Sequence, residues 1–356
     1  MPKRFIECTV PVTACNMRCS YCYVMQEGRR TNKMPEFKYT PEHIGKALSK
    51  ERLGGTCYVN ICGLGETLLP KEMPDILENI LKQGHYINVT TNGTITERFN
   101  EIIKMPHEYL ERLNFAFSFH YLELIRLGKM DEFFNNVKKV RKAGCSFVVQ
   151  LNLCDDYIPY LDEIKKICKD NIGAYPQLAA TRDEEAERIK LLTKFSEEEY
   201  KKLGEDFKSP LFEFTMKNFM VPRKEFCYAG DWSFLLDLSN GDARKCYHCP
   251  PDQNIFKNLN KPIRFEAVGN NCYGPYCVNS SHFMSLGIIP SIDTPTYADL
   301  RNRKSGNWYS KKMYKFLSQK FIDNNKEYNK LKKLRCNLTY KYRGIERRLK
   351  RITKQR

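Results

Sequence analysis

The stretch FIECTV at residues 5–10, followed by CNMRCSYC at residues 15–22, decides the fold. The first six residues are mostly apolar or β-branched, which predicts a strand, and the second stretch predicts a loop that carries three cysteines. From here to about residue 205, short β-rich segments alternate with longer helical patterns. The expected strands span residues 5–10, 57–62, 86–91, 113–120, 146–153 and 174–180.

A helical pattern follows each of these strands. Thr40 precedes the first helix and suits an N-cap, because its hydroxyl can accept a hydrogen bond from a backbone N–H of the first turn. The expected helices lie at 41–53, near 70–83, at 95–104, at 157–168 and at 196–207. After the fourth strand, helical segments are expected as far as about residue 143. Six successive strand–helix units predict parallel strands joined by right-handed crossovers. We therefore expect an α/β fold, a partial (β/α)6 TIM-like barrel whose chemistry lies at the carboxyl ends of its strands.

The loop after the first strand gathers Cys15, Cys19 and Cys22 within eight residues. Three thiolates at this spacing suit three corners of an iron–sulfur cube, and without a fourth cysteine nearby one iron keeps an open coordination site. A zinc knuckle is the alternative, but it needs a fourth Cys or His at short range, and His43 lies beyond a long loop. Fifteen cysteines in a chain without an export signal also favour thiolate-bound metal in a reducing compartment.

The motif Cys15-x3-Cys19-x-Tyr21-Cys22, placed after the first strand of this pattern, resembles the radical S-adenosylmethionine (SAM) enzymes. The resemblance implies a [4Fe–4S] cluster whose open iron is chelated by the amino and carboxylate groups of SAM, with Tyr21 beside the cofactor. It also implies that an electron, from a donor such as flavodoxin or ferredoxin, cleaves SAM to methionine and a 5′-deoxyadenosyl radical. That radical abstracts a hydrogen atom from the substrate.

A glycine segment after the second strand fits the same resemblance. Gly63-Leu64-Gly65-Glu66 resembles the Gly-Gly-Glu segment with which the family holds the methionyl amino group. Glycines let the backbone approach a ligand, and a carboxylate suits an ammonium group. Thr67 stands where the family usually has proline. A tight turn without a ligand is the other reading of this segment.

Polar residues on the third, fourth and fifth strands are further candidates for cofactor binding. Asn92 closes the third strand within Thr-Asn-Gly, which otherwise reads as an ordinary turn. Ser118 resembles the ribose-contacting position of the family, and Gln150 and Asn152 point in the same sense from the fifth strand. We expect His120 to be a hydrogen-bonded core histidine.

A second cysteine cluster starts at Cys227. Residues 232–238 alternate and are followed by Ser-Asn-Gly-Asp, which predicts a hairpin that brings Cys227 and Cys246 together. The region resembles the SPASM or shorter twitch extension of radical SAM enzymes. The resemblance implies one auxiliary [4Fe–4S] cluster held by Cys227, Cys246, Cys272 and Cys277, with the role of Cys249 left open. A structural zinc site is the alternative, because four thiolates serve either metal.

The basic charge is concentrated in the last part of the chain. Residues 301–356 hold 20 of the 59 Lys and Arg residues and 3 of the 42 Asp and Glu residues, so the net charge of +17 belongs to this segment. Nucleic-acid binding by the catalytic body is therefore not expected. Apolar residues at helical spacing between Met313 and Leu334 predict a basic amphipathic helix. Its Lys side chains form either a solvated face or a surface for an anionic membrane.

We divide the chain into a partial barrel at 1–207, a cysteine-rich auxiliary domain at 208–300 and a basic helical tail at 301–356. No apolar run reaches the roughly 18 residues that cross a bilayer. The amino end also lacks the apolar core of a secretory signal, so we expect a cytoplasmic protein, peripheral at the inner membrane face if the tail binds lipid. Only fourteen residues precede Cys15, so we expect any leader-recognition domain to be a separate protein.

The expected reaction starts with hydrogen abstraction from a small sugar-like or glycan-linked substrate and leads to oxidation or epimerisation. Epimerisation needs a hydrogen donor, and Cys154 at the end of the fifth strand is the candidate, with Cys62 as the second choice. A buried inert thiol is the alternative for Cys154. The alternative functions are a ribosomal-peptide maturase and, outside enzymes, a zinc-stabilised nucleic-acid-binding protein.

Overall fold

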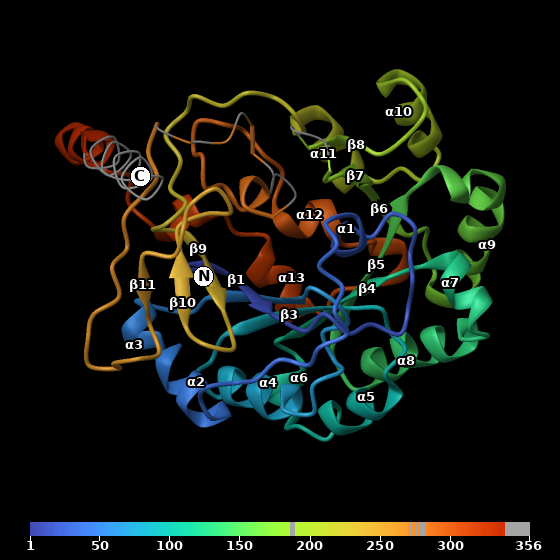
Figure 1. Cartoon of the computed structure of the whole chain (residues 1–356), viewed down its shortest axis with the longest axis horizontal. Helices are drawn as coiled ribbons and strands as arrows, with labels where there is room; N and C mark the ends of the chain where they lie inside the picture. Colours follow the sequence, from blue (N-terminus) through green and yellow to red (C-terminus); the bar gives the residue numbers. More distant parts are fainter. Residues whose placement is uncertain (186–188, 271, 273, 275, 278–281, 339–356) are drawn as a thin grey trace, which may run out of the picture.

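Six parallel strands form the body of the protein, as the main part of a larger sheet. The structure is a computed structural model that describes residues 1–185, 189–270, 272, 274, 276, 277 and 282–338. Neighbouring strands in space are neighbours in sequence, and every pair among the first six is parallel, which confirms the partial α/β barrel (Figure 1). The six strands are β1 (Phe5–Val10), β2 (Tyr58–Gly63), β3 (Tyr86–Thr91), β4 (Leu113–Ser118), β5 (Ser146–Leu153) and β6 (Gln177–Ala180).

Helices connect the strands, as the alternating pattern predicted. Thr40 caps the first of these helices as expected, since its hydroxyl accepts a 3.3 Å hydrogen bond from the His43 N–H. Pro159 interrupts the pattern after β5, so the chain first forms a 3-10 turn and only then a regular helix. These elements are α2 (Pro41–Ala47), α3 (Lys50–Leu53), α4 (Met73–Lys82), α5 (Thr96–Ile102), α6 (His107–Leu110), α7 (Tyr121–Arg126), α8 (Met130–Lys142), η1 (Asp155–Tyr160), α9 (Leu161–Ile172), α10 (Glu197–Glu205) and α11 (Pro210–Asn218).

The two faces of the sheet differ in chemistry. Alternate residues such as Ile61, Val89 and Phe117 are fully buried against the helices, and we call this the outer face. The opposite, inner face carries polar or small residues along the same strands. These inner-face residues are Glu7, Thr9, Asn60, Cys62, Asn88, Thr90, Asn114, Ala116, Ser118, Gln150 and Asn152. The inner face is therefore the place where the barrel offers hydrogen-bonding groups.

The cysteine-rich region begins by adding to the same sheet. Strand β9 (Ser233–Asp237) lies parallel to β1, and β10 (Asp242–Arg244) returns antiparallel to it, as the predicted hairpin requires. Strand β11 (Gln253–Asn254) pairs with β10 at the edge. A separate two-stranded sheet joins β7 (Arg182–Asp183) to β8 (Lys190–Leu191). The hairpin thus anchors the second cysteine cluster beside the strand that leads into the first.

Residues 297–324 close the amino-terminal end of the barrel. The ring of Tyr86 stacks on Phe316 with centroids 3.7 Å apart, and the Phe147 N–H donates to the Trp308 carbonyl over 3.1 Å. Tyr58 packs edge-on against Tyr297 at 5.3 Å. The elements of this plug are α12 (Tyr297–Arg301), η3 (Lys304–Gly306), α13 (Lys311–Leu317) and η4 (Phe321–Asn324), and the short η2 (Met284–Leu286) precedes them in the chain.

The plug corrects the expectation of one amphipathic helix between Met313 and Leu334. The chain instead forms α13, then η4, then a further helical stretch from residue 330, and the apolar side chains of Met313, Phe316 and Phe321 are buried in the core. Their helical spacing reflected core packing. Leu331 is 78% exposed, and residues 339–356 of the expected tail lie outside the described residues.

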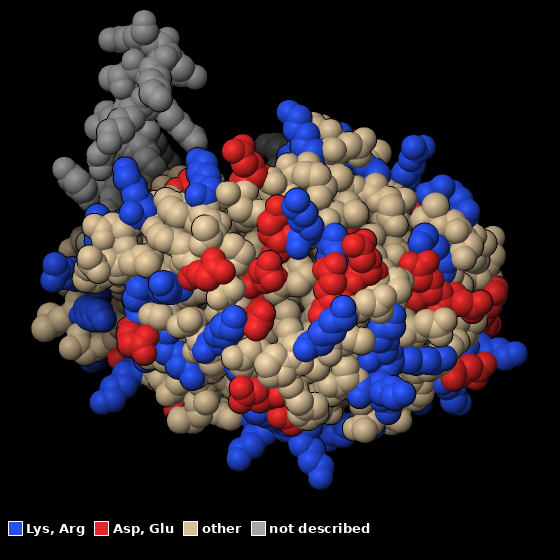
Figure 2. Space-filling view, turned by 90° about the horizontal axis from the view of Figure 1, so that it is seen from below, with Lys and Arg blue, Asp and Glu red and all other residues tan. Residues whose placement is uncertain are grey.

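The surface of the barrel carries both signs of charge. Figure 2 shows Lys and Arg interspersed with Asp and Glu over the face seen from below. This mixture agrees with the balanced charge of the first 300 residues. Among the described residues, none of the helices has the length and apolarity to span a bilayer.

Candidate active site

The three-cysteine loop lies at the carboxyl end of β1 and leads into α1 (Tyr23–Gln26). Burial raises the pKa of the Cys19 thiol, and the neighbouring thiols of Cys15 and Cys22 raise it further. Burial also raises the pKa of Cys15. Thiols whose pKa is raised in this way are poor hosts for unpaired negative charge, so as thiolates they require a cationic partner such as iron.

The arrangement of these thiols suits a cluster better than a single ion. Within the described parts of the chain, no three His, Cys, Asp or Glu side chains converge closely enough to hold one metal ion. Around one zinc ion, thiolate sulfurs lie about 2.3 Å from the metal and must converge tightly. In an iron–sulfur cube each thiolate binds a different iron, so its ligands stand farther apart. The donor set of the loop therefore fits the cluster that the sequence predicted.

Asn92 ties the cysteine loop to the end of β3. Its side-chain N–H donates to the Asn16 oxygen over 2.7 Å, and its own oxygen accepts from the Thr94 hydroxyl over 2.8 Å. The Asn92 amide also lies 3.9 Å from the Cys15 sulfur. Asn16 in turn donates to Thr94 over 2.9 Å. The structure thus places Asn92 against the cysteine loop, where it orients the ligands.

The glycine segment lies directly against the same loop. The Gly65 N–H donates to the Val12 carbonyl over 2.6 Å, and the Glu66 N–H donates to the Ala14 carbonyl over 2.9 Å. A Cβ atom on residue 65 would come within 2.1 Å of the Ala14 carbonyl oxygen, so only glycine allows this approach. Thr67 accepts a 2.8 Å bond from the Gly63 N–H, which gives the threonine a role in the turn.

The Glu66 carboxylate is engaged within the protein and is 2% exposed. It accepts hydrogen bonds from the Thr91 hydroxyl at 2.6 Å, the Asn92 N–H at 2.7 Å and the Leu68 N–H at 3.0 Å. Burial raises its pKa, while these three bonds favour the charged form. Its side chain therefore joins the end of β3 to the glycine segment, and this leaves little of the carboxylate for the ammonium contact that the sequence suggested.

Tyr21 belongs to the cysteine loop and packs against the rings of His120 and Tyr157. Its hydroxyl lies 2.7 Å from His120 Nδ1 and 3.0 Å from the Tyr157 hydroxyl. Burial lowers the pKa of His120 to about 4, so this histidine is neutral near pH 7. His120 is thus hydrogen-bonded in the way expected of a core histidine. The Tyr21 hydroxyl is engaged by these two partners, which anchor the cysteine loop to the residues after β4 and β5.

Ser118, Gln150 and Asn152 all lie half-buried on the inner face, towards the carboxyl ends of β4 and β5. Ser118 and Gln150 are register partners on adjacent strands. The Gln150 oxygen accepts a hydrogen bond from Arg301 over 3.4 Å. The structure therefore brings these three predicted residues to one side of the sheet.

The two candidate hydrogen donors differ in position. Cys154 is 5% exposed, and burial raises the pKa of its thiol to about 12. Its carbonyl accepts from the Tyr157 N–H over 3.0 Å, which places it in the packed turn that starts η1. Cys62 is half-buried on the inner face, in register with Thr9. Cys62 therefore lies on a strand of the inner face, whereas Cys154 lies just beyond the end of β5, near Tyr21 and Tyr157.

The second cysteine cluster is assembled from distant segments. Burial raises the pKa of Cys246, and the nearby thiols of Cys277, Cys227 and Cys249 raise it further. The Cys249 N–H donates to the Cys246 carbonyl over 2.9 Å, and Cys249 is buried whereas Cys272 is exposed. Burial raises the pKa of Cys227 as well, and the thiols of Cys277, Cys272 and Cys249 raise it further. The structure thus gathers all five cysteines, with Cys249 as the buried and Cys272 as the exposed candidate for the fourth ligand.

Several functional candidates escaped the sequence analysis. Glu7 and Arg301 are both buried polar residues near the inner face. A signal for Glu7 existed, because a polar residue interrupts each of the first three strands at its third position. Nothing in the sequence links Arg301, almost three hundred residues later, to the same place.

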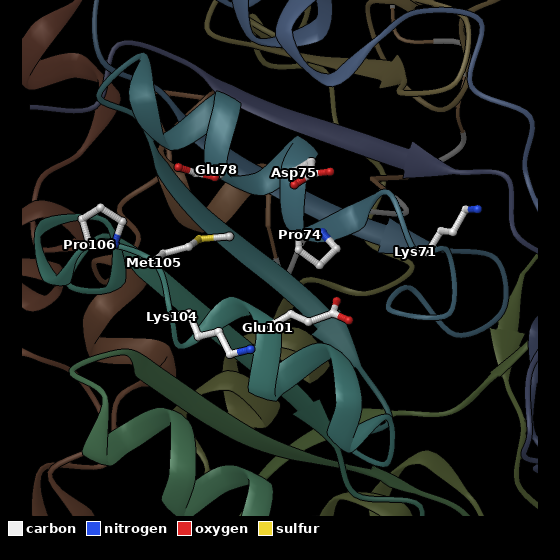
Figure 3. A pocket seen from close by; sticks show the side chains of 8 residues that line it. All are labelled: Lys71, Pro74, Asp75, Glu78, Glu101, Lys104, Met105 and Pro106. Carbon is white, nitrogen blue, oxygen red and sulfur yellow. The ribbon is translucent and has the colours of Figure 1, made fainter.

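One surface cavity lies on the helical side of the sheet (Figure 3). A cavity of about 430 Å³ is lined by Pro74, Asp75 and Glu78 of α4, Glu101 of α5 and their neighbours (Figure 3). Both helices cover the outer face, and none of the predicted site residues lines this cavity. It is therefore separate from the strand ends where the cysteine loop lies.

Comparison with known proteins agrees with this site. Residues 9–154, from β1 through β5, match the family model described as the radical SAM superfamily. The chain contains a radical SAM domain. Its cofactors are accordingly a [4Fe–4S] cluster and SAM, and the three cysteines fall within the matched residues. The matched region also includes the glycine segment and the polar residues of the inner face other than Glu7.

Solved structures share the fold of this chain. Streptococcus suis SuiB matches with a TM-score of 0.52 and 15% identity over 72% of this chain, which spans 64% of the SuiB chain. SuiB bound to precursor peptide SuiA matches with a TM-score of 0.51 and 16% identity over 72% of this chain and 63% of that chain. Native anSMEcpe with bound AdoMet and Cp18Cys peptide matches at 0.49 and 15% identity, over 73% and 80% of the two chains. Among curated protein sequences, none matches the chain.

Proposed function

We propose that this radical SAM protein removes a hydrogen atom from a sugar-like or glycan-linked substrate held on the inner face, and so oxidises or epimerises it. The observation that carries the proposal is the lining of the inner face beyond the cysteine loop, where half-buried side chains offer uncharged hydroxyl and amide groups. These residues are Thr9, Thr90, Ser118, Gln150 and Asn152. Such groups suit a neutral substrate with many hydroxyls.

The residues of the first site divide the work of binding. Cys15, Cys19 and Cys22 would hold the [4Fe–4S] cluster, whose chemistry is to supply an electron to SAM. Gly63 and Gly65 would leave room for SAM beside the loop, and Asn92 would orient the loop. Ser118, Gln150 and Asn152 hydrogen-bond to the nucleoside or to the substrate beside it. Tyr21 and Glu66 act as positioning residues through the contacts described above.

We also infer one auxiliary [4Fe–4S] cluster in the second site. Cys227, Cys246 and Cys277 supply three of its ligands. The fourth is Cys272, which the sequence suggested, or Cys249, which burial among the other thiols favours. A cluster there would supply an electron acceptor for oxidation.

We expect flavodoxin or ferredoxin to be the electron donor to the first cluster. We expect the protein to act in the cytoplasm, and an anionic membrane to be the surface that a lipid-binding tail would contact.

The proposal is tested by anaerobic reconstitution of the full chain with iron and sulfide. Dithionite and SAM should then yield 5′-deoxyadenosine, and the protein should hold about eight irons and eight sulfides, as two four-iron clusters require. A colourless protein that releases no deoxyadenosine would contradict the proposal. Zinc without sulfide would instead favour a binding module. Deuterium uptake at a substrate carbon in heavy water would indicate epimerisation rather than oxidation.

A peptide maturase is the second candidate. The solved structure of SuiB bound to precursor peptide SuiA shares the fold, and its peptide is the specific observation in favour of this candidate. A peptide substrate should expose the reacting carbon next to backbone amides, whereas a sugar presents hydroxyls. Incubation with synthetic peptides and with free or lipid-linked sugars, followed by mass spectrometry, distinguishes a mass change on the peptide from one on the sugar.

A further inference from the structure

A row of buried polar side chains crosses the inner face at the level of Glu7. Glu7 is the register partner of Asn60, Asn60 of Asn88, and Asn88 of Asn114. The side-chain N–H of each asparagine donates to the next residue towards β1, and Asn60 ends the chain by donating to Glu7 Oε1 over 2.7 Å. Because every amide dipole points the same way, the row directs its positive ends towards the Glu7 carboxylate.

The second carboxylate oxygen of Glu7 is unsatisfied. Glu7 is 5% exposed, and its Oε2 has no hydrogen-bond partner in the part of the chain that the structure describes. Leaving a buried carboxylate oxygen unpaired is costly. Burial accordingly raises the pKa of Glu7 to about 7, against the opposing effects of Asn60 and Arg301. A buried polar atom of this kind indicates a missing partner.

The titratable groups around Glu7 come from four elements. Arg301 of α12 is the cation that lowers the pKa of Glu7, against the larger effect of burial. Burial raises the pKa of Tyr297 of the same helix, and the charge of Glu7 raises it further. Burial raises the pKa of Cys62 of β2, and the charge of Glu7 raises it further. Besides burial, the charge of Glu7 also contributes to the raised pKa of Tyr247, which lies between Cys246 and Cys249 in the chain. On β1 itself, Cys8 responds to the charge of Glu7 as well. Glu7 thus lies between the plug below and the second cysteine cluster above.

Register places this oxygen at the floor of the half-buried part of the inner face. Thr9 follows Glu7 on the same face by two residues, and Cys62 follows Asn60 in the same way. Both are half-buried, whereas Glu7 and Asn60 are buried. A substrate that rests on Thr9 and Cys62 would meet Glu7 at its deepest point.

We propose that Glu7 is a catalytic residue whose Oε2 accepts a hydrogen bond, and then the proton, from a substrate hydroxyl. The inference rests on the proposed function and narrows it to oxidation of an alcohol. In that reaction the carbon loses one hydrogen atom to the deoxyadenosyl radical, the hydroxyl loses its proton to Glu7, and one electron passes to an oxidised iron–sulfur cluster. The substrate C–H and O–H bonds break, and a C=O bond forms. Epimerisation releases no such proton and would leave Glu7 unused.

The test compares wild type with Glu7→Gln, which keeps an oxygen for Asn60 and cannot accept a proton. The probe is myo-inositol, a neutral compound with six hydroxyls, added to the reconstituted full chain and followed by saturation-transfer NMR. We expect wild type to bind it more tightly as pH rises through about 7, because ionised Glu7 is the better acceptor. Glu7→Gln should bind about tenfold or more weakly at pH 8, without that pH dependence. Equal binding by both proteins, or no binding by wild type, would overturn the inference.

Two controls separate this inference from the proposed function. Formation of 5′-deoxyadenosine by wild type from SAM and dithionite tests the proposed function separately from any role of Glu7. If wild type itself forms none, the proposed function fails instead. Glu7→Asp retains the charge, but its side chain is one methylene shorter, so its carboxylate oxygens lie farther from the substrate. This variant should bind myo-inositol weakly while keeping a pH dependence. If it binds as tightly as wild type, the position of Oε2 does not matter and the inference is wrong.

Stability gives an independent readout of the same carboxyl group. Since its folded-state pKa of about 7 is above the ordinary value near 4.5, the folded state holds the proton more tightly than the unfolded state. Wild type should therefore lose about 3 kcal/mol of unfolding free energy as pH rises from about 4.5 to 7, and Glu7→Gln should lack this loss. Urea titrations at a series of pH values measure it. Parallel curves for the two proteins would contradict an unsatisfied Glu7.

Discussion

The two cysteine sites of this protein are built in opposite ways. The first takes Cys15, Cys19 and Cys22 from one loop of eight residues, and the turn of that loop places them. The second gathers Cys227, Cys246 and Cys277 over about fifty residues, by way of a hairpin that pairs with β1. A local site can be recognised from spacing alone, whereas a dispersed site depends on the packing of its segments. The predictions below test whether this difference also governs function.

The largest effect should come from removing a ligand of the first site. Cys15→Ala should reduce 5′-deoxyadenosine formation to the background of uncatalysed SAM breakdown, because the cluster would lose one of only three protein ligands. Cys227→Ala is the matched variant, and it should keep deoxyadenosine formation while the iron content falls to about four per chain. Liquid chromatography and iron analysis measure both. Loss of deoxyadenosine in Cys227→Ala would show that the two sites are not independent.

The approach of the glycine segment to the cysteine loop should be nearly as sensitive. Gly65→Ala would push a Cβ against the Ala14 carbonyl oxygen, so we expect about 1–3 kcal/mol of destabilisation and weaker iron binding at the first site. Thermal unfolding and iron analysis measure these effects. Gly28→Ala is the control, since its new Cβ meets nothing within 4 Å and only the φ of +63° is strained. If Gly65→Ala behaves like this control, the close approach is not required.

The second site can be sharpened by comparing its two candidate fourth ligands. Cys249 is buried among the other thiols and Cys272 is exposed, so Cys249→Ala should lose most of the auxiliary iron, about four per chain, and Cys272→Ala should retain it. Electron paramagnetic resonance of the reduced protein, together with iron analysis, distinguishes the variants. The opposite result would restore the ligand set that the sequence suggested.

The smallest effect is expected where the end of the described chain supports the second site. The Asn337 side chain exchanges two hydrogen bonds of 3.0 Å with Asn270, next to Gly269, the residue that bridges to Cys227. Asn337→Ala should cost about 1–2 kcal/mol and leave deoxyadenosine formation unchanged. Chemical denaturation measures the cost. A large loss of auxiliary iron in this variant would mean that the contact organises the site as well as stabilising it.

Much of the fold could be predicted because its signals are local. Three of the six strands, β1, β3 and β5, have the boundaries that their apolar and β-branched runs indicated, and Thr40 caps its helix as expected. Strand β6 begins at Gln177 rather than at residue 174, after Pro176, which has no N–H for a ladder. The spacing of apolar residues from Met313 to Leu334 led to the wrong prediction of a single amphipathic helix, because core packing and an amphipathic surface helix produce the same period.

The sequence alone determined the cysteine loop and the alternation of strands and helices, since both depend on contacts between residues close together in the chain. Tertiary structure decided the rest of the site. It turned Glu66 inward to hold the end of β3, set Cys249 among the second group of thiols, and aligned Glu7 with Asn60, Asn88 and Asn114. These placements arise from strand register and from segments tens of residues apart in the chain. A polar residue acquires its chemistry only when burial removes the water that would otherwise solvate it.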